Sequence, residues 1–99
     1  MSDSFRLTPR AAADLDAIAD YTIKTWDLAQ LETYLLGLNK RFQWLAENSL
    51  AGRERNDIHP GYRSHPEGSH IIFYIIDEDR QVDIIGIPHK SMDVSAFFI

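Results

Sequence analysis

The sequence predicts an α+β fold with the element order β-α-α-β-β-β, in which an N-terminal helical hairpin packs on a mainly antiparallel sheet. The first half of the chain carries apolar residues at the three-and-four spacing of amphipathic helices. The second half carries short apolar runs that turn residues separate, which is typical of strands. The chain has 99 residues, so we expect one domain over residues 1–99.

The first strand and the first helix are predicted close to the N-terminus. A weak alternation of apolar and polar residues in Ser4–Leu7 favours a short strand. We expect Thr8 to cap the following helix and Pro9 to occupy its first position, where a backbone N–H would have no partner. Asp14 and Asp16 are expected to lie near enough to the helix start to favour its macrodipole. The apolar face consists of Leu15, Ile18, Ala19, Thr22 and Trp26.

The second helix has the most regular pattern in the chain. Asp27 and Gln30 form a variant of the capping box at its start. The spacing of the apolar residues in this helix is compatible with an intermolecular coiled coil. The very short linker to the first helix favours an antiparallel hairpin within the chain instead. Its apolar residues recur at intervals of three and four: Leu28, Leu31, Leu35, Leu38, Phe42 and Leu45.

The remaining strands follow a long polar connection, Asn48–Pro60, of a length that is often functional. Turns are expected at Pro66–Gly68 and Asp77–Arg80. His70–Ile76 is apolar on both faces, which predicts a central strand, and Pro88 is expected to end the last one. The three predicted strands are Tyr62–His65, Ser69–Ile76 and Gln81–Ile87.

The composition limits the classes of ligand. The net charge is −5, and neither half of the chain is basic, which disfavours direct binding to nucleic acid. The chain has no cysteine, which fits a reducing cytoplasm, where we expect this protein to reside. Met1–Ser4 does not begin a signal peptide, and the longest apolar run, Ile71–Ile76, is too short to span a membrane, so no membrane association is expected.

Two kinds of chemistry, RNA cleavage and metal binding, can be compared with the residues that this chain offers. RNA cleavage without a metal needs an acid, a base and cations for the phosphate charge. Glu54 and Asp57 alternate in the sequence with the cations Arg53 and Arg55. A nuclease is therefore disfavoured but stays open as an alternative. The residues with suitable chemistry are Arg53, Arg55, Arg63, His89 and Lys90.

Metal binding has weaker support. His65 and His70 flank a predicted turn and are expected to face each other across it. Two imidazoles are too few ligands for a protein metal site, so an ordinary surface pair is the favoured interpretation. We therefore expect no metal, no cofactor and no catalytic residue.

Six short segments follow one another in a distinctive order. They are Thr8–Leu15, Ile18–Thr22 with Trp26, Ala51–Arg53, Gly61–Ser64, Gly68–Tyr74 and His89–Asp93. Each segment alone is a weak signal. Together, in this order and at this spacing, they resemble the ParE branch of the RelE/ParE superfamily of bacterial toxins over nearly the whole chain.

The resemblance implies a RelE/ParE-like fold and the toxin of a type II toxin–antitoxin system. ParE-like toxins bind DNA gyrase and poison it, which inhibits growth, and systems of this kind act in plasmid stabilisation. A ParD-like antitoxin is the implied partner that neutralises the toxin. Three alternatives stay open: a RelE-like ribosome-dependent mRNA endonuclease, a ParE-like protein that has lost toxicity and only binds an antitoxin, and an unrelated small interaction module.

The chain departs from the family pattern at three positions. Gly86 occupies the place of an arginine that the last strand usually carries, and Pro88 replaces a leucine. Ser91 stands where an arginine often precedes the Met-Asp pair. If those arginines bind the target, the departures affect toxicity or target identity.

Two sets of binding residues are expected. Arginine and the aromatic residues are enriched at interface hot spots, and an apolar partner helix can lie in the groove of a helical hairpin. The apolar C-terminal segment Phe97–Ile99 is expected to dock on the sheet or to insert into a partner. The target-binding residues are Arg53, Arg63, His89, Lys90, Met92, Phe97 and Phe98. The antitoxin-binding residues are Tyr34, Leu36, Trp44, Tyr62 and Arg63.

Overall fold

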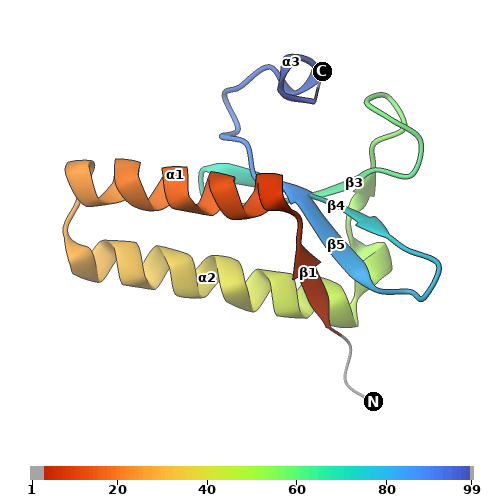
Figure 1. The fold of residues 1–99 in the computed structure, drawn as a ribbon, viewed down its shortest axis with the longest axis horizontal. Helices are drawn as coiled ribbons and strands as arrows, with labels where there is room; N and C mark the ends of the chain where they lie inside the picture. The colour runs from red at the N-terminus through yellow and green to blue at the C-terminus, as the bar shows by residue number, and fades with distance from the viewer. Residues whose placement is uncertain (1–3, 99) are drawn as a thin grey trace.

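A computed structural model describes residues 4–98 of the chain. Two predictions concern residues outside this range in part. They are the absence of a signal peptide at Met1–Ser4 and the docking of the apolar segment Phe97–Ile99. Figure 1 shows two long helices side by side, next to a twisted sheet. The elements are β1 (Phe5–Leu7), α1 (Pro9–Thr25), α2 (Leu28–Glu47), the 3₁₀ helix η1 (Ser49–Ala51), β2 (Arg53–Glu54), β3 (Arg63–Glu67), β4 (His70–Ile76), β5 (Val82–Gly86) and α3 (Val94–Phe97).

The predicted α+β fold is confirmed, with one strand and two short helices more than expected. The strands are arranged in the order β1-β5-β4-β3-β2. β1 pairs with β5 in parallel, and the other neighbours are antiparallel. β4 is therefore the central strand, as its apolar faces predicted. Ile72 and Tyr74 belong to the hydrophobic core, whereas Phe73 points to the other face of the sheet.

The start of α1 agrees with the sequence, except for its charges. The Thr8 hydroxyl accepts a hydrogen bond from the Ala11 N–H at 3.2 Å and donates one to the Ile84 carbonyl at 2.9 Å, so the cap also attaches the helix to β5. The macrodipole role of Asp14 and Asp16 is wrong, because the first turn of α1 contains no acidic residue. Asp14 instead accepts the Ile87 N–H at 2.9 Å.

The helical hairpin forms as predicted. Asp27 caps α2 and accepts the Gln30 N–H at 2.8 Å, and α1 and α2 then run antiparallel (Figure 1). Most of the regular seam on α2 is buried against α1 and the sheet. Its first member, Leu28, is exposed, because it lies at the tip of the hairpin beyond the sheet. The buried members are Leu31, Leu38, Phe42 and Leu45.

Two local predictions are wrong. The connection Asn48–Pro60 is not all loop, because it contains η1 and the edge strand β2. β3 continues through Pro66 to Glu67, so the turn begins at Gly68, which has a φ of 56°. Since β2 pairs only with the first two residues of β3, Pro66 lies where its missing N–H costs no ladder bond on that side.

The longer β3 also changes the pairing of the histidines. His65 pairs with Ile72, and His70 pairs with Glu67. The predicted contact between His65 and His70 is therefore wrong. An isolated bridge joins His70 to His89 instead, so the end of β4 meets the segment after β5.

Gly52 packs against the buried Tyr74 side chain. The Tyr74 hydroxyl accepts the Gly52 N–H at 2.8 Å and donates to the Ser49 carbonyl at 2.7 Å. A Cβ atom on residue 52 would lie 2.2 Å from that oxygen. Burial of the ring raises the pKa of Tyr74, so the hydroxyl keeps its proton and its role as a donor. The contact with Tyr74 explains why position 52 in the family segment Ala51–Arg53 is a glycine.

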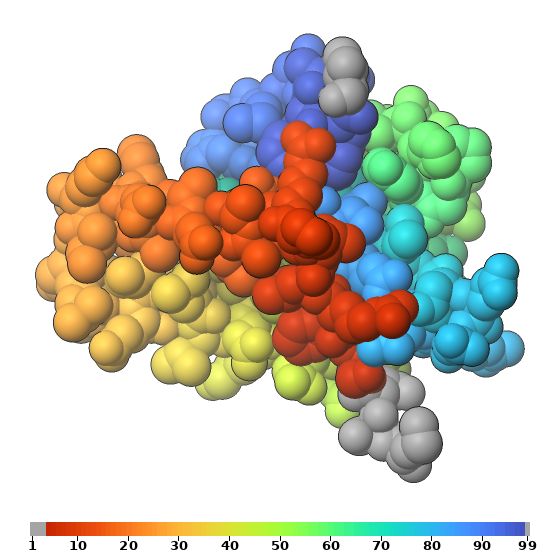
Figure 2. All heavy atoms as spheres, in the orientation of Figure 1, coloured from red at the N-terminus to blue at the C-terminus, as the bar shows by residue number. Residues whose placement is uncertain are grey.

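Phe97 and Phe98 dock on the outer face of the sheet. Asp93 caps α3, and the Phe98 ring lies 4.9 Å from Phe73 and 5.3 Å from Tyr62 between centroids. The Arg10 guanidinium lies 4.0 Å above the centre of the Phe97 ring. Figure 2 accordingly shows the dark blue C-terminal segment against the red start of α1. In this structure the two aromatic residues dock on the chain itself.

No helix among residues 4–98 combines the length and the apolar character that crossing a membrane requires.

Candidate functional site

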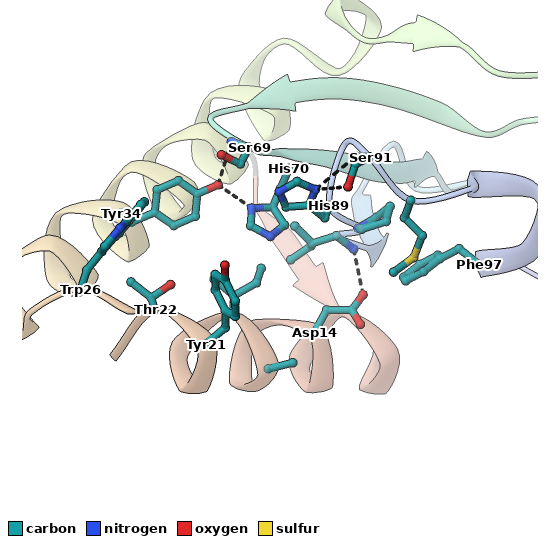
Figure 3. A pocket seen from close by; sticks show the side chains of 15 residues that line it. Asp14, Tyr21, Thr22, Trp26, Tyr34, Ser69, His70, His89, Ser91 and Phe97 are labelled. Atoms are coloured by element: carbon teal, nitrogen blue, oxygen red, sulfur yellow. Dashed lines mark hydrogen bonds between the residues drawn. The ribbon is translucent and has the colours of Figure 1, made fainter. Parts of the chain in front are cut away.

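A cavity of about 560 Å³ lies between α1, α2 and the segment after β5 (Figure 3). Its α1 wall includes Ile18, Thr22 and Trp26 of the predicted apolar face, and its opposite wall comes from residues 87–97. Tyr21, Trp26 and Met92 at its edge are exposed by 70%, 48% and 47%. Besides Tyr21 and Trp26, the residues with polar side chains that line it are Asp14, Thr22, Tyr34, Ser69, His70, His89 and Ser91.

Tyr34 organises the polar end of this cavity. Its hydroxyl oxygen lies 2.5 Å from Nδ1 of His70 and accepts the Ser69 N–H at 3.2 Å. Its proton also lies within reach of the Glu67 carbonyl, at 3.2 Å. Partial burial raises the pKa of Tyr34, so the phenol remains neutral. Gly68 makes this arrangement possible, because a Cβ atom there would lie 2.6 Å from the Tyr34 ring.

His70 and His89 form a pair beside Tyr34. Their ring centroids are 5.3 Å apart in an edge-to-face arrangement. The Ser91 N–H donates to Nδ1 of His89 at 3.1 Å, and the Ser91 hydroxyl lies 2.7 Å from the same atom. Burial lowers the pKa of His70, and the nearby His89 lowers it further. Two ring nitrogens, Nε2 of His70 and Nε2 of His89, have no hydrogen-bond partner within residues 4–98.

The lowered pKa of His70 predicts a loss of stability in acid. As the pH falls below about 6.5, the unfolded chain takes up the proton before the folded protein does, so unfolding becomes easier. The loss of stability is absent well above about pH 6.5. It is complete once the pH falls below the pKa of His70 in the folded protein. Urea unfolding between about pH 5 and 7.5 measures it. We expect His70→Gln to show a shallower pH dependence than the natural protein.

The matched control for this prediction is His59→Gln, which removes an exposed histidine from the loop before β3. Parallel pH profiles for His70→Gln and the natural protein would show that His70 does not lower stability in acid.

A second surface lies at the edge of the sheet, around β2 and β3. Arg63 donates to the Gly52 carbonyl at 2.8 Å and forms an ion pair with Glu54 at 3.4 Å, which leaves its side chain only 18% exposed. Arg55 forms an ion pair with Asp57 at 3.1 Å and lies over the Phe73 ring. Arg53 is exposed on β2, opposite Ser64. Most of the positive charge on this surface is thus already paired.

The structure divides the predicted binding residues between these surfaces. Tyr34 joins three of the predicted target-binding residues, His89, Met92 and Phe97, around the cavity. Tyr62, Phe98, Arg53 and Arg63 belong to the second surface. Neither surface contains the remaining predicted residues: Leu36, which is exposed on α2, Trp44, which packs on Arg41 and His65, and the exposed Lys90.

The sequence analysis did not identify His70 as a residue of the binding site. His70 was considered only as a metal ligand, and no local pattern brings it next to Tyr34 and His89. The isolated bridge between His70, at the start of β4, and His89, in the segment after β5, creates the contact between the two histidines. Among residues 4–98, no group of three or more histidine, aspartate or glutamate side chains could hold a metal ion.

Two of the departures from the family pattern have local explanations. A Cβ atom at Gly86 would lie 2.8 Å from the Phe97 ring and 3.2 Å from the Phe98 ring, so glycine allows the C-terminal segment to dock. Ser91 holds His89 through its N–H and its hydroxyl. Pro88 is buried, and its carbonyl accepts the Ile71 N–H at 2.9 Å, but nothing in the structure explains proline rather than leucine there.

Comparisons with known proteins agree with this fold. The family model of the ParE toxin of the type II toxin–antitoxin system parDE matches residues 5–94. A Mycobacterium tuberculosis protein named Toxin ParE1 is 37% identical over 94 residues, which cover 95% of this chain and 96% of the relative. A solved structure of a chromosomal ParDE system from P. aeruginosa has a TM-score of 0.74 at 21% identity, over 89% of this chain and 96% of the other.

A second solved structure, of the toxin–antitoxin complex RelBE2 from Mycobacterium tuberculosis, has a TM-score of 0.61 at 21% identity, over 91% of this chain and 100% of the other. The fold is therefore that of the RelE/ParE toxins, with a helical hairpin on a mainly antiparallel sheet. Within that class, the chain belongs to the ParE family of toxins of type II toxin–antitoxin systems.

Proposed function

We propose that this protein inhibits bacterial growth by binding DNA gyrase in the cytoplasm, and that a ParD-like antitoxin neutralises it. Membership of the ParE family over residues 5–94 supports the proposal. The similar solved structures described above come from a ParDE system and from a toxin–antitoxin complex, which favours an antitoxin as partner. A role in plasmid stabilisation would follow from the same activity.

The paired arginines are the observation that most favours protein binding over RNA cleavage. Arg55 and Arg63, two of the cations that a nuclease of this fold could use, form ion pairs with Asp57 and Glu54. The net charge of −5 would further weaken phosphate binding. Cations that carboxylates already neutralise are poor stabilisers of a phosphorane transition state. A non-enzymatic mode of action fits these residues better.

The two surfaces suggest a division of binding roles. We assign the antitoxin mainly to the cavity and the adjacent hairpin, where Tyr34, Leu36 and Trp44 lie. We assign the target mainly to the exposed Arg53, to Lys90 and to the docked Phe97 and Phe98. Met92, at the edge of the cavity, is assigned to both partners. Arg63 and Tyr62 contribute by holding β2 and the docked Phe98 in place.

A gyrase supercoiling assay with the purified protein, run beside a ribosome-programmed mRNA cleavage assay, tests the proposal. We expect loss of supercoiling with intact mRNA. The double variant Lys90→Ala/Met92→Ala, which changes exposed side chains only, is expected to weaken inhibition about tenfold, as removal of interface contacts does. Leu50→Ala, which truncates a side chain that is 73% exposed elsewhere, is the matched control and is expected to inhibit normally.

The other outcomes identify the alternatives. Cleaved mRNA with normal supercoiling would replace the proposal with a RelE-like endonuclease. Folded protein that is silent in both assays would support a chain that has lost toxicity and retains only antitoxin binding.

A further inference from the structure

The cavity between α1 and residues 87–97 contains chemistry that the proposed function does not yet explain. Nδ1 of His70 is engaged by the Tyr34 hydroxyl, and Nδ1 of His89 accepts from Ser91. An imidazole nitrogen that accepts a backbone N–H carries no proton, so neutral His89 must carry its proton on Nε2. The Tyr34 hydroxyl has one proton and two acceptors within reach, Nδ1 of His70 at 2.5 Å and the Glu67 carbonyl at 3.2 Å. Donation along the shorter contact, to Nδ1, leaves the proton of neutral His70 on Nε2. Both rings then present Nε2–H as a donor.

Two adjacent imidazole donors favour an anion. Burial lowers the pKa of His70, and the nearby His89 lowers it further, so a positive charge on His70 is costly in this site. A carboxylate next to the rings would remove that cost and would accept hydrogen bonds strengthened by its charge. Lys90 adds a positive charge in the same segment. Asp14 lines the cavity from α1, but the Ile87 N–H holds its carboxylate.

The surroundings of the two rings are apolar. The walls include Ile18, Ile87, Pro88 and Phe97, and the exposed apolar area is larger than the polar area. A ligand for this cavity therefore needs an apolar body next to its carboxylate, since burial of apolar surface supplies most of the binding energy.

The rim indicates a polypeptide rather than a free small molecule. Tyr21, Trp26 and Met92 stand around the opening with about half or more of their surface exposed. Trp26 and Tyr34 also line a second, more open hollow along α2. A small molecule that fills the cavity would leave the rim and the second hollow uncovered, whereas a chain segment would cover all three. Contiguous apolar surface of this kind marks interaction sites.

We infer that this cavity receives an apolar side chain of a partner polypeptide together with a neighbouring carboxylate, which His70 and His89 bind through Nε2. The inference rests on the proposed antitoxin partnership, because the antitoxin is the polypeptide that would supply this pair. It specifies the chemistry of the contact: a leucine-like anchor in the cavity, a glutamate or aspartate on the imidazoles, and further apolar residues over Trp26.

Model peptides test the inference without gyrase, so its failure is distinct from a failure of the proposed function. The probe is a short alanine-based helical peptide that carries one leucine and, one turn later, one glutamate. The comparison peptide has glutamine in place of the glutamate. Affinities come from NMR titrations that follow the imidazole signals of His70 and His89. We expect the glutamate peptide to bind about tenfold more tightly, because hydrogen bonds to a charged group are the stronger ones.

Variants then assign the preference to the two rings. The double variant His70→Gln/His89→Gln, followed through the signals of Tyr34 and Met92, is expected to bind both peptides equally. Because His70 is partly buried, His89→Gln at an exposed position is the second variant and should lose a large part of the preference. His59→Gln/His65→Gln removes two histidines outside the cavity and should keep the tenfold preference.

Several results would overturn the inference. One is equal affinity of the natural protein for both peptides, or no binding of either. Another is a full preference in the double variant, which would place the carboxylate elsewhere. N-acetyl-leucine that binds as tightly as the glutamate peptide would show that the rim contributes nothing and that the cavity is a small-molecule site.

Discussion

Replacing Phe42 with alanine is expected to lower the free energy of unfolding by about 3–5 kcal/mol, the largest effect of any single substitution considered for this fold. Phe42 lies on α2, is only 2% exposed, and packs 5.3 Å from the ring of Phe5 on β1. It belongs to the core cluster that joins the hairpin to β4 and β5. Truncation would remove apolar burial and leave a cavity that the surrounding core closes only in part.

Urea unfolding followed by circular dichroism measures this effect. The control is Leu36→Ala on the same helix, where a side chain that is 59% exposed is expected to change stability by no more than about 0.5 kcal/mol. A loss below about 1 kcal/mol for Phe42→Ala would mean that α2 does not pack on the sheet as described. Domains of this size often have a total stability of about 5–15 kcal/mol, so the variant could be partly unfolded at physiological temperature.

Replacing Gly86 with arginine, the residue that the family pattern favours at this position, is expected to expel the C-terminal segment from the sheet. The new Cβ atom would lie 2.8 Å from the Phe97 ring, which is closer than carbon atoms approach, and 3.2 Å from the Phe98 ring, which is a tight contact. We expect a loss of about 1–3 kcal/mol from this overpacking and the release of both rings. Hydrogen exchange of residues 94–98, together with the NMR contact between Phe98 and Phe73, reports the release directly.

Gly37→Ala is the matched control for Gly86→Arg. Gly37 lies inside α2, and a Cβ atom there would be 3.7 Å from the nearest side-chain atom, an ordinary contact. Because alanine is the better helix former, we expect this variant to be more stable by about 0.5–1 kcal/mol. If Gly86→Arg retained the contact between Phe98 and Phe73, the steric reason for glycine at position 86 would be wrong.

The sequence alone determined the elements whose signals are local. Thr8 with Pro9, and Asp27 with Gln30, predicted both helix starts, because a cap depends on residues within one turn of it. The spacing of leucines predicted the helical hairpin, and the two apolar faces of His70–Ile76 predicted the central strand. The ordered family segments added the class of protein, which the comparisons confirmed.

Local signals failed where pairing between distant segments decides the outcome. The edge strand β2 is two residues long, too short for periodicity to reveal, and it exists because β3 offers it a neighbour. The extension of β3 through Pro66 moved the turn and with it the partner of every residue in the hairpin, since register is a property of two strands and not of one.

The candidate site belongs to that second category. Tyr34, His70 and His89 are far apart in the sequence, and each alone is an unremarkable residue. The hairpin places Tyr34 over the start of β4, and the pairing beyond β5 brings His89 to His70. The sequence determined which side chains were available and which family they belong to. Only the tertiary structure decided which of them meet, because the contacts that form the cavity join segments that no periodicity or spacing relates.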